Sequence, residues 1–200
     1  MDEGGFWDVV AEAYAALECG WYDEDTPRDA VAVAWSSLLA ERSADDVLDF
    51  AVHYERAMER ARRPVTLAAA ALLSGGAADD WYGRFAYEDR FAAFRSALVA
   101  LGRTSFEAVI AEPDVLASLP DADAVERGDW DFFANLDAVP RDAYAAAGGD
   151  PGAFANAVAG QLGARPVRGV PPLRGEWHID ESTLATRFPK LAARFPDGVH

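Results

Sequence analysis

Two pairs of adjacent acidic residues are the strongest candidates for chemistry in this sequence. Asp79-Asp80 follows a glycine-rich turn, and Glu88-Asp89 comes a short distance later. Carboxylates can bind a hard cation or take part in acid–base catalysis when oxygen atoms converge from several elements. Adjacent acids are also common at the start of a helix, where free amides and the positive end of the helix dipole favour them. Both interpretations apply to each pair.

Arg95 is the cationic candidate near these acids. It follows Phe94 on a predicted helix with an apolar face, so we expect its side chain at the edge of the buried face. Such an arginine usually pairs with a carboxylate, because an unpaired buried charge costs free energy. Asp79, Asp80 or Asp89 could form a structural salt bridge with it. The alternative is that Arg95 binds an anionic ligand.

Two neighbours complete the candidate set. Trp81 directly follows the first acidic pair, and Arg103 follows Gly102, which is expected to end the helix of Arg95. A cation just beyond a helix end can also simply complement the dipole. The candidate ligand- or partner-binding residues are therefore Asp79, Asp80, Trp81, Asp89, Arg95 and Arg103. The sequence leaves open which acidic pair, Asp79-Asp80 or Glu88-Asp89, faces Arg95.

No pattern in the sequence indicates a metal or a cofactor. The three histidines are far apart and match no zinc-binding spacing. The single cysteine, Cys19, excludes a disulfide within the chain and a thiolate metal cluster. The only lysine is Lys190, so the lysine of a nucleotide-binding P-loop is missing. We predict no metal and no cofactor.

The net charge of the chain limits the classes of molecule that it is expected to bind. There are 34 acidic residues against 18 lysines and arginines, which gives a net charge of −16. An acidic surface disfavours binding to nucleic acids and to anionic membranes. The longest apolar run, residues 65–73, is too short to span a bilayer, and the N-terminus lacks the features of a signal peptide. We predict a cytoplasmic protein whose partner is another protein or a small molecule.

The spacing of apolar residues predicts an all-α fold. Helices are expected at about 4–19, 26–41, 44–61, 65–73, 89–101, 129–147, 151–162 and 181–195, with shorter ones beginning at Thr104 and Pro113. No segment shows sustained period-two alternation, so a sheet is not expected. Residues 65–73 are apolar on every side, which predicts a central helix surrounded by the others. Proline and glycine in residues 164–176 predict an extended loop. We expect one compact bundle formed by residues 1–200.

A family resemblance is strongest in residues 88–119. This segment combines acids, aromatic residues, a glycine and a later proline at fixed positions: Glu88-Asp89, Phe91, Phe94-Arg95, Leu98, Gly102-Arg103 and Pro113-Asp114. The combination resembles the signature of the bacterial family known as domain of unknown function 4240. Three other parts of the chain are similar to that family: Phe6-Trp7, the Ala-rich helix before Gly75-Gly76, and the segment from Phe188 to Leu191.

The chain also departs from the family pattern in two places. The family tends to place its acidic pair directly after the two glycines, whereas here several residues intervene and include a second pair. A tryptophan usually found after Phe-Arg is Ala97 in this chain. The resemblance implies a fold and no particular activity.

Two functional hypotheses follow from the sequence. The first is a bacterial regulatory or partner-binding helical protein, with acidic faces and surface tryptophans such as Trp81 and Trp130 as contact points. The second is a small-molecule- or metal-dependent enzyme, with a site between the Gly75-Gly76 turn and the Phe94-Arg95 helix. The first is favoured because the chain has no recognisable catalytic motif. An open cleft lined by Arg95 and the acids supports the enzyme, and closed ion pairs between them under a packed surface support the binding protein.

Overall fold

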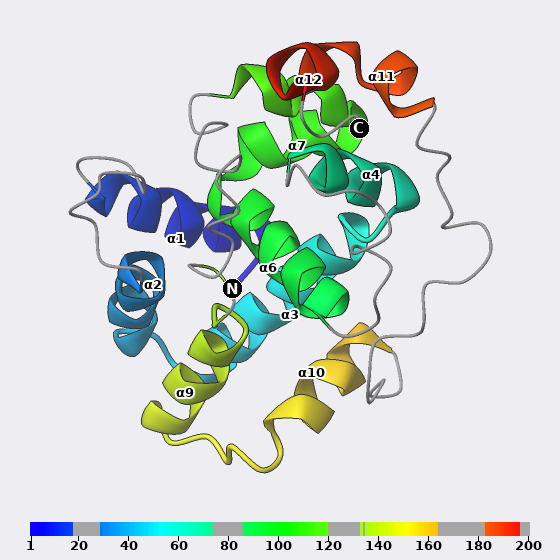
Figure 1. The fold of residues 1–200 in the computed structure, drawn as a ribbon. Helices are drawn as coiled ribbons and strands as arrows, with labels where there is room; N and C mark the ends of the chain where they lie inside the picture. The colour runs from blue at the N-terminus through cyan, green and yellow to red at the C-terminus, as the bar shows by residue number, and fades with distance from the viewer. Residues whose placement is uncertain (18–28, 74–85, 120–132, 134, 164–182, 197–200) are drawn as a thin grey trace.

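The computed structural model describes residues 1–17, 29–73, 86–119, 133, 135–163 and 183–196, with the side chains at 71 and 86–90 outside this description. These residues form helices that pack on one another, and no strand occurs among them (Figure 1). The predicted all-α fold is therefore confirmed. The predicted loop at 164–176 lies outside the described residues.

The chain order of the elements follows the predicted series of helices closely. The first half contains α1 (Glu3–Ala16), α2 (Ala30–Ala40), α3 (Ala44–Arg60), α4 (Pro64–Leu73) and α6 (Ala86–Ala100). The second half contains α7 (Arg103–Ala111), the 3-10 helix η1 (Pro113–Ser118), α9 (Ala138–Ala146), α10 (Phe154–Leu162), α11 (Leu184–Arg187) and α12 (Pro189–Arg194). The helix expected at 181–195 is interrupted near Pro189, where α12 begins after the end of α11 at Arg187.

Local capping residues explain several of these boundaries. Asp2 caps α1, since its carboxylate accepts a hydrogen bond from the Gly5 amide at 2.8 Å. The Ser43 hydroxyl accepts from the Asp46 amide at 3.1 Å at the start of α3. Gly102 has a φ of +84° between α6 and α7, a conformation that favours glycine.

The prediction for residues 129–147 was too long. Residues 129–132 lie outside the described part, Phe133 is in a 3-10 turn, and α9 begins only at Ala138. Pro140 gives the physical reason. Proline has no amide hydrogen and fits only the first turn of a helix, so a helix containing Pro140 begins just before it.

Two helices, α4 and α6, occupy the interior. In α4, the residues with described side chains between Thr66 and Leu73 are all buried, as expected for a helix apolar on every side. From Phe91 to Ala100, α6 is buried except for the half-buried Ala92, and it contacts α1, α3, α4 and α7. The predicted central helix therefore shares its position with α6, which lies in the middle of the fold (Figure 1).

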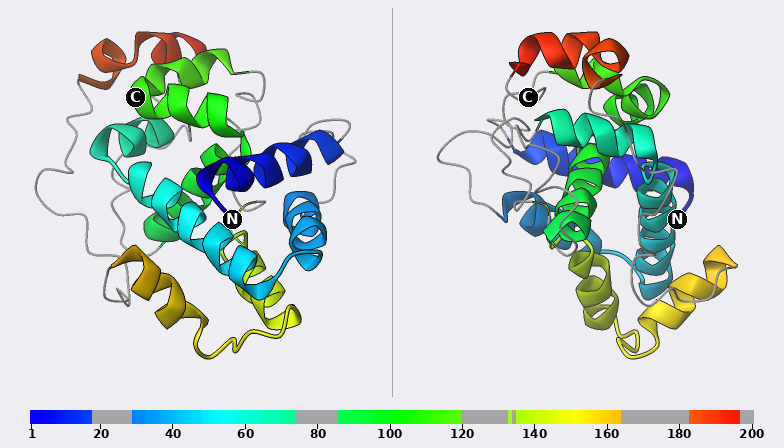
Figure 2. Two further views of the ribbon diagram at one scale, coloured as in Figure 1. Left: turned by 180° about the vertical axis from the view of Figure 1, so that it is seen from behind. Right: turned by 45° about the vertical axis from the view of Figure 1, so that its right-hand side comes forward.

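The C-terminal helix α12 is fixed to η1 by a buried carboxylate. Asp114 is 5% exposed, and its two oxygens accept hydrogen bonds from the Lys190 and Leu191 amides at 2.9–3.2 Å. Asp114 thus caps the first turn of a helix far away in the sequence. In return, the Arg194 guanidinium donates to the Ala117 carbonyl at the end of η1. These contacts hold α12 and η1 together at one end of the molecule, opposite to α9 and α10 (Figures 1 and 2).

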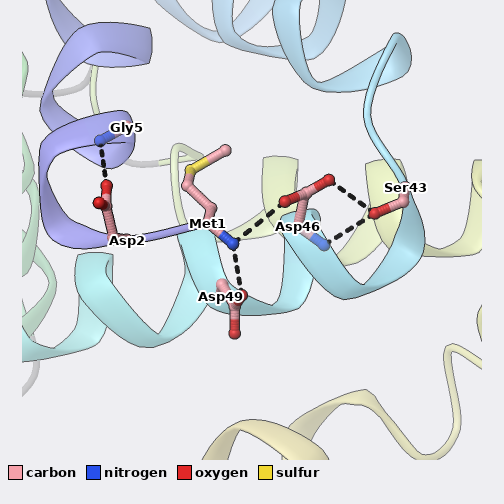
Figure 3. A network of polar contacts seen from close by, with 6 residues as sticks. All are labelled: Met1, Asp2, Gly5, Ser43, Asp46 and Asp49. Atoms are coloured by element: carbon pink, nitrogen blue, oxygen red, sulfur yellow. Dashed lines mark hydrogen bonds and ion pairs between the residues drawn. The ribbon is translucent and has the colours of Figure 1, made fainter.

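A polar network joins the start of α1 to the start of α3 (Figure 3). The Met1 ammonium lies 3.0 Å from an Asp46 oxygen and 2.6 Å from an Asp49 oxygen. The second Asp46 oxygen accepts from the Ser43 hydroxyl at 2.7 Å. Hydrogen bonds to Asp49 and Asp46 raise the pKa of the Met1 ammonium above its ordinary value of 8.0. Hydrogen bonds from Ser43 and then from the Met1 ammonium lower the pKa of Asp46 below 3.8.

This network predicts a pH-dependent contribution to stability. A raised pKa in the folded state means that the Met1 contribution is complete below pH 8.0 and is lost as the pH rises through the folded-state pKa. The Asp46 contribution is complete above pH 3.8 and is lost as the pH falls through its lowered pKa. Asp49→Asn is expected to lower the free energy of unfolding at neutral pH and to have less effect at about pH 10.

Urea denaturation of wild type and Asp49→Asn across this pH range tests the prediction. Asp45→Asn is the matched control, since Asp45 is an exposed acid of the same helix turn and takes no part in the network. A difference between wild type and Asp49→Asn that stays constant up to about pH 10 contradicts it.

Candidate functional site

The structure places Arg95 inside the protein and not at the edge of the buried face. Arg95 is 7% exposed and its neighbour Ser96 is 3% exposed. The sequence prediction was wrong here because Ala93, Ala97 and Ala100 are too small to keep other helices away, and α6 is covered on nearly all sides. The polar side chains therefore lie at the α3–α6 interface. We call Tyr54, Met58, Arg95 and Ser96 the Arg95 cluster.

Arg95 donates its hydrogen bonds to the backbone. Its Nη1 lies 2.9 Å from the Met58 carbonyl, and its Nε lies 3.3 Å from the Phe91 carbonyl. The guanidinium carbon lies 5.0 Å from the centre of the Phe91 ring, within cation–π distance.

The Met58 carbonyl belongs to the last turn of α3. The backbone amides of residues 61–63 donate to the carbonyls of Ala57, Glu59 and Ala61 and not to that of Met58. The Met58 carbonyl accepts its hydrogen bond from Arg95 instead. A cation at the C-terminal end of a helix is stabilised by the helix dipole, and the free carbonyl needs a donor. Arg95 therefore acts as a capping group for α3, supplied by another helix.

The expected carboxylate partner of Arg95 is not found in the described part of the structure. No described Asp or Glu lies within ion-pair distance of Arg95, because its donors go to carbonyl oxygens. Asp79, Asp80 and Trp81, and the side chain of Asp89, lie outside the described residues. Burial lowers the pKa of Arg95, and the positive charge of Arg62 lowers it further. Arginine nevertheless stays protonated in proteins, so the buried charge persists.

The hydroxyl groups of the Arg95 cluster bond to each other. The Tyr54 and Ser96 oxygens are 2.7 Å apart, and the Ser96 hydroxyl also lies 3.0 Å from the Ala92 carbonyl. Burial raises the pKa of Tyr54, so its phenol stays neutral. A serine nucleophile needs an adjacent base, and the described partners of Ser96 are a phenol, a thioether and a carbonyl. The contacts of the cluster join α3 to α6.

Arg103 is engaged on the surface and takes no part in the Arg95 cluster. It is the first residue of α7, and its guanidinium lies 4.0 Å from the Glu3 carboxylate, with both side chains more than half exposed. Nearby, Arg60 makes two hydrogen bonds to Glu107, at 2.8 and 2.6 Å. These exposed pairs connect α7 to α1 and α3.

The described aromatic and metal-ligating side chains show no further site. Trp7 and Trp35 are core residues, while Trp81 and Trp130 lie outside the described part of the chain. His53 stacks on Phe6 with ring centres 6.0 Å apart. Among the described residues, no three side chains of His, Cys, Asp or Glu converge on one point. None of the described helices has both the length and the hydropathy that a membrane crossing needs.

Sequence reasoning missed three residues that the structure makes important. Tyr54 and Ser96 were expected only as parts of helices, and Asp114 only as a starting residue of its own short helix. A signal for Asp114 was present, because an acid between Pro113 and Val115 lies in an apolar segment that a charge enters only with partners. Its partners are too distant in the sequence to be inferred.

The sequence places the chain in one family. Residues 1–146 match the family described as protein of unknown function (DUF4240), and the chain belongs to it. This match confirms the resemblance seen in residues 88–119. Comparison with the curated proteins and with the solved structures gives no significant match. The matched region ends with the last residue of α9, so α10, α11 and α12 lie beyond it.

Proposed function

We propose that this protein is a cytoplasmic regulatory or partner-binding helical protein, and that it contacts a protein partner through the outer side of α2. The single observation that carries the proposal is the absence of charge from this helix. The sequence of α2 is AVAVAWSSLLA, in a chain with a net charge of −16. A partner can cover an uncharged and partly exposed helix on so acidic a chain without removing water from charged groups.

The two sides of α2 differ in exposure. Val31, Trp35 and Leu39 are buried against the core. The other side presents four exposed residues at helical spacing, which we call the α2 face: Val33, Ser36, Ser37 and Ala40. Val33 is 55% exposed and is the large hydrophobic residue that stands out on the surface of the described part.

The chemistry of the α2 face indicates the kind of partner. Small side chains let another helix or strand approach closely, and covering uncharged surface avoids the cost of removing water from ions. The acids Asp29 and Glu41 lie at the two ends of the face and are exposed. A partner with an apolar centre and basic residues around it fits this arrangement.

The environment of Arg95 supports the same proposal. Closed ion pairs between Arg95 and the nearby acids under a packed surface were expected for a binding protein, and an open cleft for an enzyme. Those acids lie outside the described side chains, so only the burial of Arg95 supports the proposal. Arg95 is buried at the α3–α6 interface, where its Nη1 and Nε donate to the Met58 and Phe91 carbonyls. We therefore place the surface that contacts the partner on the outside of the molecule.

A photo-crosslinking experiment tests the role of the α2 face. A benzophenone amino acid at Ser37, in cells that naturally contain the protein, is expected to give a discrete adduct with one partner protein. The same group at Thr104, exposed on α7, is the matched control and should not give that adduct. With the identified partner purified, Val33→Glu is expected to weaken the affinity by about tenfold or more, because it places a charge in the contact. Equal adducts from both positions, or an unchanged affinity of Val33→Glu, contradict the proposal.

The alternative function is a small-molecule- or metal-dependent enzyme with a site between the Gly75-Gly76 turn and the Phe94-Arg95 helix. One observation favours it: the buried charge of Arg95 has no carboxylate partner among the described residues. Thermal-shift titrations of wild type and Arg95→Met with inorganic phosphate, succinate and Mg²⁺ test this alternative. It requires a concentration-dependent stabilisation of wild type that Arg95→Met lacks. No stabilisation of wild type by any of the three contradicts it.

A further inference from the structure

Helix α10 differs from the rest of the fold in its position. It begins after the family-matched residues 1–146 and lies at the end of the molecule opposite to α11 and α12 (Figures 1 and 2). Its main contact is with α3. A helix beyond the matched residues, packed mainly against one central helix, is a candidate for a regulatory element.

The contact between α10 and α3 forms a hydrophobic cluster of its own. On α10, Phe154, Val158 and Leu162 follow one another at four-residue spacing and so share one side of the helix. On α3 they meet Leu48, Ala51 and Val52, which we call the α3 strip. Ala51 and Val52 are 3% and 2% exposed under this cover. The cluster is separate from the main core.

The way α10 is held contrasts with the way α12 is held. Three hydrogen bonds to Asp114 and one from Arg194 tie α12 to η1. In the described structure, no side-chain hydrogen bond or ion pair joins residues 154–162 to another element, and Phe154 adds only a ring contact with Tyr144 at 5.3 Å. Helix α10 can therefore leave α3 without breaking a polar bond. An element that packs outside the main hydrophobic core opens locally more easily than one within it.

Glycines bound α10 on both sides. Gly148 and Gly163 have φ values of +89° and +67°, which favour glycine. Gly149 lies against the Tyr144 ring, and a Cβ there would come within 2.2 Å of it. The chain thus changes direction after α9 at Gly148, and α10 ends at Gly163 in a left-handed conformation.

We propose that α10 is a detachable cover, and that the α3 strip beneath it is a second docking surface for a partner helix. The partner that fits is a helix with large apolar residues at four-residue spacing, because α10 itself fills the strip in that way. This inference is independent of the α2 face. It gives the protein a closed state, with α10 on the α3 strip, and an open state able to bind.

Hydrogen exchange and peptide binding on the full-length chain test the proposal. In wild type, the amides of 154–162 are expected to exchange at least about tenfold faster than those of 91–100, since local opening needs less free energy than global unfolding. Val158→Glu is expected to increase exchange in 154–162 while 91–100 keeps its protection. Ala155→Glu, on the exposed side of the same helix, is the matched control and should exchange like wild type.

A labelled peptide covering residues 150–163 measures the docking surface directly. It is expected to bind Val158→Glu with at least about tenfold higher affinity than wild type, because α10 competes for the strip in wild type. Adding Val52→Glu to Val158→Glu should abolish this binding.

Three outcomes overturn the proposal. They are equal protection of α10 and α6 in wild type, loss of the whole fold in both Val158→Glu and the milder Val158→Ala, and equal peptide affinity for wild type and Val158→Glu. None of these outcomes bears on the crosslinking at Ser37, so the two proposals fail separately.

Discussion

Asp114→Ala is expected to lower the free energy of unfolding by about 3 kcal/mol, one of the two largest effects among the substitutions considered. The wild-type carboxylate is 5% exposed and accepts hydrogen bonds from two backbone amides, Lys190 and Leu191. Alanine leaves both amides without this acceptor at the first turn of α12 and removes a charge that the helix dipole stabilises. Helix α12 should then detach from η1 at lower denaturant concentration than in wild type.

Chemical denaturation and hydrogen exchange of the full chain measure this effect. Asp114→Asn keeps the size of the side chain and one oxygen acceptor. Its free energy of unfolding should therefore lie between those of wild type and Asp114→Ala. Glu112→Ala is the control, because Glu112 is an exposed acid just before η1, and it should change stability by no more than about 0.5 kcal/mol. If Asp114→Ala behaves like this control, the capping of α12 by Asp114 does not contribute to stability.

Arg95→Ala is also expected to lower the free energy of unfolding by about 3 kcal/mol, but for a different reason. It removes a large buried side chain from the α3–α6 interface and leaves a cavity lined by Phe91 and Met58. It also leaves the Met58 carbonyl, at the end of α3, without its donor.

Arg95→Met separates the volume of the side chain from its charge. Methionine fills much of the space and removes a charge that is costly to bury, so the expected loss is about 1 kcal/mol, chiefly from the unpaired Met58 carbonyl. The control is Arg141→Met on the surface, where Arg141 pairs with the neighbouring Asp142 and both are exposed; a change within about 0.5 kcal/mol is expected.

Urea denaturation with and without inorganic phosphate completes this comparison. If Arg95 has only a structural role, wild type, Arg95→Met and Arg95→Ala keep the same order of unfolding free energies in both buffers. A cost of Arg95→Met that equals the cost of Arg95→Ala shows instead that the charge itself is required. If the loss of unfolding free energy caused by replacing Arg95 is larger in phosphate, the result supports the alternative ligand site.

The boundaries of the helices show how far local sequence goes. The helix start predicted at residue 44 and the helix end predicted at Gly102 are both found, and both depend on contacts within four residues of the chain. Where a prediction was too long, at 129–147, the signal was also local, since Pro140 limits where α9 can begin. Residue spacing and capping determine these features because both partners of each contact are near each other in the sequence.

The candidate site shows the opposite case. Spacing placed Arg95 on a helix beside the apolar face and suggested an acidic partner. The structure gives it the Met58 carbonyl, 37 residues away, and the same principle recurs where Arg63 donates to the Ile110 carbonyl at the end of α7. An arginine can satisfy its donors on a free helix end as well as on a carboxylate, and the sequence does not show which helix end comes near.

By itself, then, the amino-acid sequence determined the helical class, the family and most helix ends, because these depend on periodicity and on contacts over a few residues. Only the tertiary structure decided that Arg95 is interior, that Asp114 caps a helix 76 residues away, and that α10 covers the α3 strip. These features depend on which helices pack together, and helix packing is set by the summed burial of many side chains and not by any one motif.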